Sequence, residues 1–177
     1  MKILIYLCCG LIPVFLLVTY IIFGRLPASL SETYYMYKRK FGIIWPFKAL
    51  LWILVAMIMP VWFEASDGEH NSITFLAFLS CVSLGSVAIE AEYLGRDEKT
   101  HQIFTGVAFI LSLLWSVLIG QFIVPLYLYS LVTVVVVLGM IFISGSFLHK
   151  FTSMKGLLLF ECAAFYTIFF SILMITK

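Results

Sequence analysis

Two ionisable side chains inside long apolar runs are the first residues of this sequence that could do chemistry. Lys48 lies about five residues into the apolar run that begins near residue 43, and Glu161 lies about six residues after Lys155. With a helical rise of 1.5 Å per residue, both side chains would lie about 8–9 Å deep in their runs. Because an unpaired charge is costly inside a membrane, we expect an ion pair between Lys48 and Glu161, or a binding or gating role for them.

A carboxylate and an imidazole form a second candidate site. Glu92 and His101 lie on either side of a short connector, so two packed helices would bring them together as candidate catalytic residues. Such a pair either orders the turn through a hydrogen bond or transfers protons, and with His149 it would form half of a metal site. Glu90 lies about 200° around the helix from Glu92, so it would serve a different face as a candidate ligand-binding residue.

Metal hydrolysis is disfavoured by the number and spacing of possible ligands. A zinc site needs three or four His, Cys or carboxylate ligands, usually with local spacing such as i,i+4, and His101, His149 and Glu92 supply no such pair. Compared with ceramidase-like seven-helix hydrolases, which use a serine, several histidines and an aspartate, the chain has too few of these residues. We therefore predict no metal ion and no cofactor.

The composition indicates which elements must position these residues. Of 177 residues, 63% are apolar and only 11% are charged, with a mean hydropathy of +1.12. Soluble domains have about 45–50% apolar and about 25% charged residues. A soluble domain, a disordered chain and a disulfide scaffold are therefore excluded, and the net charge of +2 gives no reason to expect a nucleic-acid partner. A polytopic membrane protein in contact with the lipid bilayer remains.

The lengths of the apolar runs predict six membrane-spanning helices, each of about 20 residues. The runs are too continuously apolar for the alternating strands of a membrane barrel. We therefore predict an all-α fold, a polytopic transmembrane bundle that forms one integral-membrane domain over residues 1–177. The expected spans are approximately residues 2–23, 43–63, 72–94, 101–119, 122–143 and 156–176.

Lysine and arginine predict the orientation of the bundle, because cytoplasmic connectors carry an excess of both. The odd-numbered connectors hold eight of the eleven basic residues: Arg25, Lys38, Arg39, Lys40, Arg96, Lys99, Lys150 and Lys155. The opposite side has Lys2 and Lys177 at the termini. We therefore expect the odd connectors in the cytoplasm and both termini on the non-cytoplasmic side.

The first connector is the most patterned stretch outside the spans. Ser29 and Glu32 have the spacing of a capping box, which predicts a short interfacial helix over residues 29–41 that Gly42 closes. Its apolar-aromatic stripe would lie at headgroup depth, and its basic end would lie on anionic lipid. The connector is either a membrane-anchored elbow or part of a site in which Ser31, Glu32 or Tyr34 binds a ligand.

The run from Leu26 to Tyr35, Leu-Pro-Ala-Ser-Leu-Ser-Glu-Thr-Tyr-Tyr, carries a resemblance, together with the segment from Phe75 to Cys81. These segments resemble uncharacterised small polytopic membrane proteins of Bacteroidetes and their phages over about the first half of the chain. The resemblance implies a bacterial inner-membrane location and no established activity. Those proteins have a small-residue and proline segment where this chain has Ile89-Glu-Ala-Glu92, so a role for these glutamates would be particular to this branch.

Three functions remain open. The leading hypothesis is a protein that binds a lipid or other hydrophobic molecule in a cavity open to the cytoplasmic leaflet. The alternatives are a membrane-embedded, hydrolase-like enzyme with a Glu/His site at the cytoplasmic face, and a small proton-coupled transporter. We also expect a homo-oligomer, because the small residues Ala77, Cys81 and Gly85 form a helix stripe that allows close approach.

Overall fold

All regular elements of the described residues are α-helices. The computed structural model describes residues 2–66, 71–90, 98–120 and 156–175. In chain order the helices are α1 (Lys2–Phe23), α2 (Glu32–Phe41), α3 (Trp45–Ser66), α4 (Asn71–Ile89), α5 (Glu98–Gly120) and α8 (Gly156–Ile175). The expected span over residues 122–143 lies outside the described residues.

Five of the six predicted spans appear as helices. The one expected over 2–23 is α1, with the predicted bounds, and those expected over 43–63, 101–119 and 156–176 are α3, α5 and α8, with ends shifted by up to three residues. The helix expected over 72–94 ends at Ile89, where a turn at Glu90 follows, so Glu92 is not part of the described helix. The connector helix begins at Glu32 instead of residue 29, because residues 28–31 form turns.

Two glycines end the first two helices. Gly24 and Gly42 both have positive φ values, 68° and 69°, which residues with a side chain rarely adopt. The Gly24 amide donates to the Tyr20 carbonyl at 2.7 Å, and the Gly42 amide donates to the Lys38 carbonyl at 3.0 Å. The role predicted for Gly42 is therefore confirmed.

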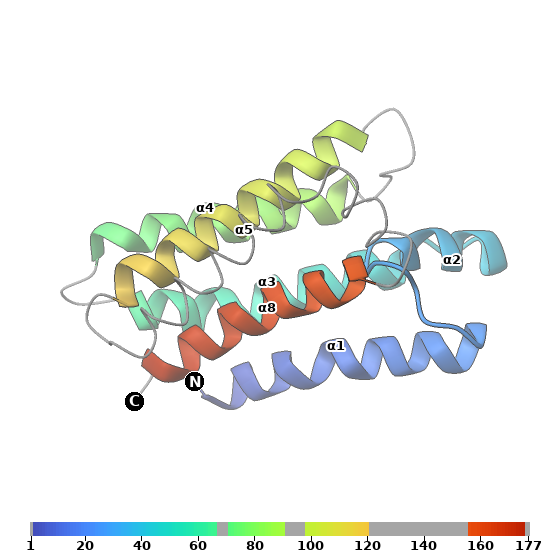
Figure 1. Cartoon of the computed structure of the whole chain (residues 1–177), viewed down its shortest axis with the longest axis horizontal. Helices are drawn as coiled ribbons and strands as arrows, with labels where there is room; N and C mark the ends of the chain where they lie inside the picture. The colour runs from blue at the N-terminus through green and yellow to red at the C-terminus, as the bar shows by residue number, and fades with distance from the viewer. Residues whose placement is uncertain (1, 67–70, 91–97, 121–155, 176–177) are drawn as a thin grey trace.

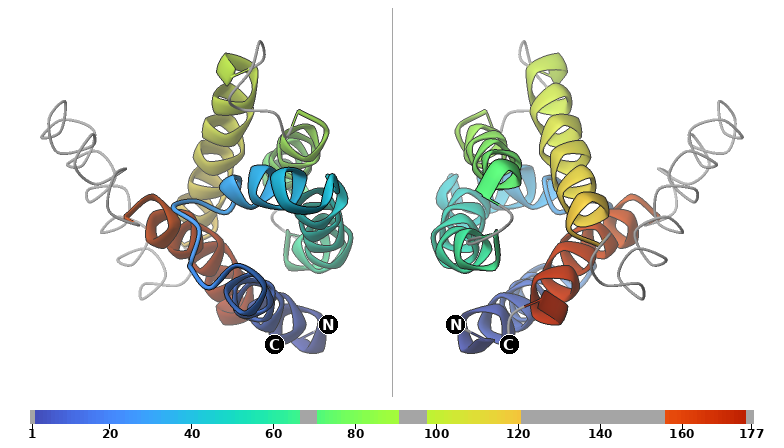
Figure 2. Two further views of the ribbon diagram at one scale, coloured as in Figure 1. Left: turned by 90° about the vertical axis from the view of Figure 1, so that its right-hand side faces the viewer. Right: turned by 90° about the vertical axis from the view of Figure 1, so that its left-hand side faces the viewer.

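The long helices lie roughly side by side (Figure 1). α4 packs against both α3 and α5, and α1 packs against both α3 and α8. Both chain ends lie at one end of the molecule, and α2 lies at the opposite end, next to α3 (Figures 1 and 2). At the end of the molecule where α2 lies, the loop before α2 contacts the first turn of α8.

A few buried polar contacts hold the helices in register. Trp115 Nε1 donates to Ser66 Oγ at 2.8 Å, and the Trp115 ring meets Trp62 edge to face with centroids 5.4 Å apart. Ser80 Oγ donates to the Ala108 carbonyl at 2.8 Å and so joins α4 to α5. Such hydrogen bonds between helices give buried polar atoms a partner without the burial of a charged side chain.

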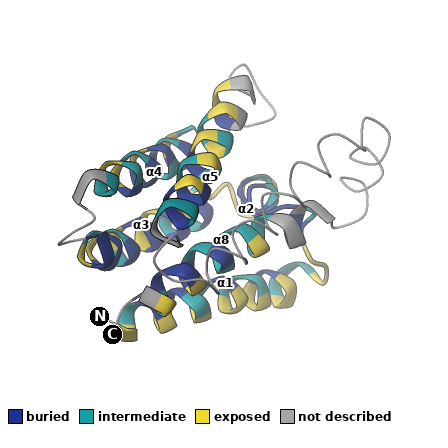
Figure 3. Ribbon diagram, turned by 60° about the vertical axis from the view of Figure 1, so that its left-hand side comes forward, coloured by how far each residue is buried: buried dark blue, intermediate teal, exposed yellow. Residues whose placement is uncertain are grey.

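Among the described helices, α1 and α3 are long and apolar enough to cross a membrane. The apolar parts of the other long helices that the structure describes are shorter: Ile73–Ile89, Ile103–Leu118 and Glu161–Met174. On α1, one face is covered by large exposed apolar side chains, including Ile3 at 74% and Ile21 at 71% exposure (Figure 3).

Candidate binding cavity

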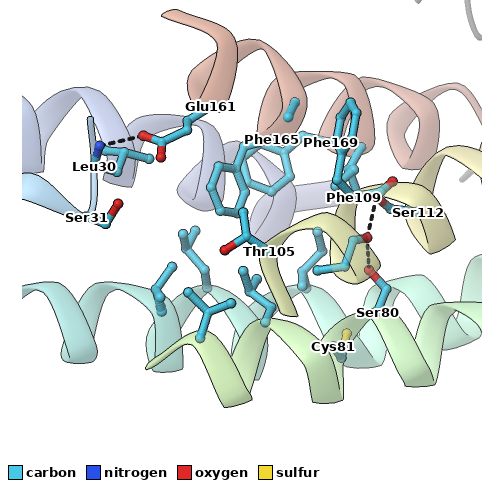
Figure 4. Close-up of a pocket in the computed structure, with 18 of the residues that line it drawn as sticks. Leu30, Ser31, Ser80, Cys81, Thr105, Phe109, Ser112, Glu161, Phe165 and Phe169 are labelled. Carbon is cyan, nitrogen blue, oxygen red and sulfur yellow. Dashed lines mark hydrogen bonds between the residues drawn. The ribbon is translucent and has the colours of Figure 1, made fainter. Parts of the chain in front are cut away.

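A cavity lies between α3, α4, α5 and α8, and the loop before α2 lines one end of it (Figure 4). The space open to the centre of a water-sized molecule is about 110 Å³. On α3 the lining runs from Phe47 to Trp62, a length of about 22 Å at 1.5 Å per residue. The cavity is therefore elongated along the helices.

The lining is almost entirely apolar. Each helix contributes a stripe with spacings of three and four residues, which places its members on one face. On α8 this stripe includes Ala164, Phe165 and Phe169, and on α5 it includes Ala108 and Phe109. The Ser112 hydroxyl in the wall bonds to its own helix, at 2.9 Å from the Ala108 carbonyl, so it offers little polarity to a ligand.

One end of the cavity carries a carboxylate. Glu161 Oε2 accepts a hydrogen bond from the Leu30 backbone amide at 2.5 Å, and the Ser31 side chain lines the same end of the cavity (Figure 4). One turn earlier on α8, the Leu158 amide donates to the Ala28 carbonyl at 2.9 Å. These contacts fasten residues 28–31 to the start of α8, and we call this pair of contacts the loop–α8 clamp.

Local hydrogen bonds prepare the loop for this contact. The Glu32 amide donates to Ser29 Oγ at 3.0 Å, as the capping box predicts. The Glu32 carboxylate does not reach back to the Ser29 amide but binds the Ala28 amide and Arg25 Nη2, the latter at 3.0 Å. The first hydrogen bond of the predicted box therefore forms, although the N-cap residue of α2 is Ser31 and the bond lies in the turn before the helix. The second bond is shifted by one residue, from the Ser29 amide to the Ala28 amide.

The ion pair predicted between Lys48 and Glu161 is not formed. Lys48 Nζ donates to the Ile89 carbonyl at the end of α4, at 3.0 Å, and lies 6.0 Å from the centre of the Tyr34 ring. The last carbonyls of a helix carry partial negative charge and attract a lysine. Lys48 and Glu161 thus each bind a backbone group. The depth of a residue within its apolar run does not reveal such a partner.

His101 lies in the cavity wall and is 6% exposed. Its Nδ1 atom lies 2.9 Å from the backbone carbonyl oxygen of Glu90, which follows the last turn of α4. The pairing of His101 with Glu92 stays a prediction, because Glu92 lies outside the described residues, as does His149. Within the described part of the chain, no three His, Cys, Asp or Glu residues could together hold a metal ion.

The structure brings together three of the residues that the sequence singled out. Ser31, His101 and Glu161 all line the cavity, whereas Glu32, Tyr34, Lys48 and Glu90 do not. Tyr34 is 2% exposed and packs inside the protein, and its expected position at headgroup depth stays a prediction. Ala77, Cys81 and Gly85 are buried within this one chain, and homo-oligomerisation through them stays a prediction.

Sequence reasoning missed most of the lining. On α3 the residues that line the cavity follow each other at spacings of four, three, four and four: Phe47, Leu51, Leu54, Ile58 and Trp62. A helix that is apolar on every side hides such a stripe, because hydropathy no longer separates the inner face from the outer one. On α8 a usable signal existed, since Phe165 and Phe169 follow Glu161 at intervals of four.

Comparison with protein-family models, curated proteins and solved structures finds no match. The resemblance to small membrane proteins of Bacteroidetes and their phages thus stays a prediction.

Proposed function

We propose that this chain is a multi-pass integral membrane protein that binds a hydrophobic molecule in the cavity between α3, α4, α5 and α8. Two helices long enough to cross a membrane and the exposed apolar face of α1 support a location in lipid. In water, an apolar face of this kind would be an unfavourable surface.

The proposed orientation places the loop–α8 clamp toward the cytoplasm. The basic side chains Lys38, Arg39 and Lys40 are exposed on α2, at the end of the molecule opposite both termini. Cytoplasmic connectors are enriched in such residues. The carboxylate end of the cavity would then lie in the cytoplasmic leaflet, and both termini would lie on the other side.

The shape and lining of the cavity are the observations that support the proposed function. It is long, apolar along its length and polar at the end where Glu161 and Ser31 lie. An apolar wall with a few polar groups at one point fits a ligand with a chain and a polar head. A lipid or lipid-like amphiphile has this form.

Two adjacent alanines on α8 allow a matched test. Ala164 lines the cavity, whereas Ala163 is exposed on the outer side of the same helix. We expect Ala164→Trp to fill the cavity and displace the bound molecule, and Ala163→Trp to leave it in place. Native mass spectrometry of both variants and the wild type, extracted from membranes in mild detergent, measures the fraction of protein that carries a bound lipid.

The expected result is a bound lipid on the wild type and on Ala163→Trp, with at least a tenfold lower occupancy on Ala164→Trp. Equal occupancy of all three proteins would mean that the lipids are only annular, and it would overturn the proposal.

A further inference from the structure

The charge distribution around the cavity points to the chemistry of the ligand's head. Among the described residues that line the cavity, Glu161 is the only acid, and none is a lysine or arginine. The ion pair found in the described part of the chain joins Arg25 to Glu32, outside the cavity. The only basic side chain among these lining residues is the imidazole of His101, whose Nδ1 atom lies 2.9 Å from the Glu90 carbonyl oxygen. The described cavity wall therefore presents a carboxylate with no lysine or arginine beside it.

The lysine that the sequence paired with Glu161 is already engaged. Lys48 is the only basic residue of α3, and its ammonium group binds the Ile89 carbonyl at 3.0 Å. Glu161 instead receives a backbone N–H from Leu30. Two carboxylate oxygens offer about four acceptor positions, so this donor leaves room for more.

A carboxylate beside an apolar chamber is costly unless a partner brings donors or positive charge. A head whose only charge is a phosphate or a carboxylate would be repelled, whereas an ammonium group supplies three N–H donors and a full positive charge. The Ser31 hydroxyl oxygen, next to Glu161, can accept one further N–H from the same head.

We propose that the molecule in the cavity is an aminolipid, whose protonated amine binds Glu161 and Ser31 and whose chain lies along Phe165 and Phe169. This proposal rests on the proposed function, because it names the ligand class of the same cavity. The shared chemistry is a primary ammonium on an apolar chain, which a single-chain amine and phosphatidylethanolamine both provide.

Probes with the same chain and different heads distinguish the contribution of the head to the affinity from that of the chain. Hexadecylamine, hexadecanol and hexadecanoic acid are titrated at neutral pH into the full-length protein in a neutral detergent, and native mass spectrometry measures their affinities. We expect the amine to bind at least about tenfold more tightly than the alcohol, because each factor of ten needs only about 1.4 kcal/mol. The acid should bind more weakly than the alcohol.

Glu161→Gln tests the carboxylate directly. Its amide oxygen can still accept the Leu30 N–H, so the loop–α8 clamp is retained while the charge is lost. The variant should lower the affinity for the amine about tenfold and leave that for the alcohol unchanged. Glu64→Gln, at an exposed acid near the far end of α3, is the matched control and should change neither affinity. The affinity for phosphatidylethanolamine, compared with that for hexadecylamine, then decides between a two-chain and a single-chain ligand, and phosphatidylglycerol with equal acyl chains is the control without an amine.

The outcomes distinguish this proposal from the proposed function. If Ala164→Trp binds every probe as well as the wild type does, cavity binding itself fails. If Ala164→Trp loses all probes, but the wild type binds amine, alcohol and acid equally, the cavity stands and the aminolipid proposal is overturned. Tightest binding of the acid would overturn it as well. The comparison of the three probes on the wild type needs no variant, so it remains decisive even if Glu161→Gln does not fold.

Discussion

At the scale of single residues, backbone groups decide where the charged side chains go. Glu32 binds the Ala28 amide, Glu161 binds the Leu30 amide, and Lys48 binds the Ile89 carbonyl. Unpaired backbone groups at helix ends and in turns are strong partners for charges. Sequence patterns show which side chains are charged, but they do not show which backbone groups remain free. For this reason the capping contact of Ser29 was predictable and the partner of Lys48 was not.

The Ser29 cap can be tested by its removal. In Ser29→Ala the Glu32 amide loses its acceptor, and we expect the free energy of unfolding to fall by about 1 kcal/mol, the usual value of such a cap. Ser86→Ala is the control, because the Ser86 hydroxyl bonds only to Val82 in the preceding turn of its own helix. Unfolding in mixed micelles, followed by circular dichroism, measures both variants. Equal stability of the two would contradict the capping role.

At the scale of helices, the apolar runs predicted where the described elements lie but not how they pack. Residues 2–23 were predicted to form a helix and do so, since a charge and a glycine mark the ends of an apolar run clearly. The end of α4 was predicted five residues too late, because the sequence gives no clear stop signal between Ile89 and Glu92. The cavity needs four helices with stripes that face one another, and the facing sides are hidden in helices that are apolar all around.

The contact between α3 and α4 makes a sharp prediction about glycine. A Cβ atom at Gly85 would lie 3.3 Å from the Trp52 ring, whereas one at Gly106 on α5 would meet nothing within 4 Å. We expect Gly85→Leu to push α4 away from α3 and to destabilise the protein by about 1–3 kcal/mol. Gly106→Leu should be neutral or slightly stabilising, because leucine favours helix more than glycine does.

Thermal unfolding of both leucine variants in the same detergent checks this prediction. A Gly85→Leu variant as stable as Gly106→Leu would show that α3 and α4 do not approach closely at this point.

At the scale of the whole molecule, the arrangement of the ends predicts a topology. Both termini lie at one end, and the basic α2 lies at the other. We expect alkaline phosphatase fused after Lys177 to be active outside the cytoplasm, and the same enzyme fused after Gly42 to be inactive. Green fluorescent protein at these two positions should give the opposite pattern. Activity of both phosphatase fusions, or of neither, would contradict the proposed orientation.

The loop–α8 clamp also sets an order of events during synthesis. The Leu30 amide and the Glu161 carboxylate that it binds are 131 residues apart in the chain. At about 5–20 residues per second, the ribosome needs roughly 7–26 s to make the intervening chain. During this time the loop before α2 has no α8 to bind, and a wall of the cavity is missing. The cavity is thus completed only when α8 has been made, so the proposed ligand can be enclosed only once α8 has packed against the other helices.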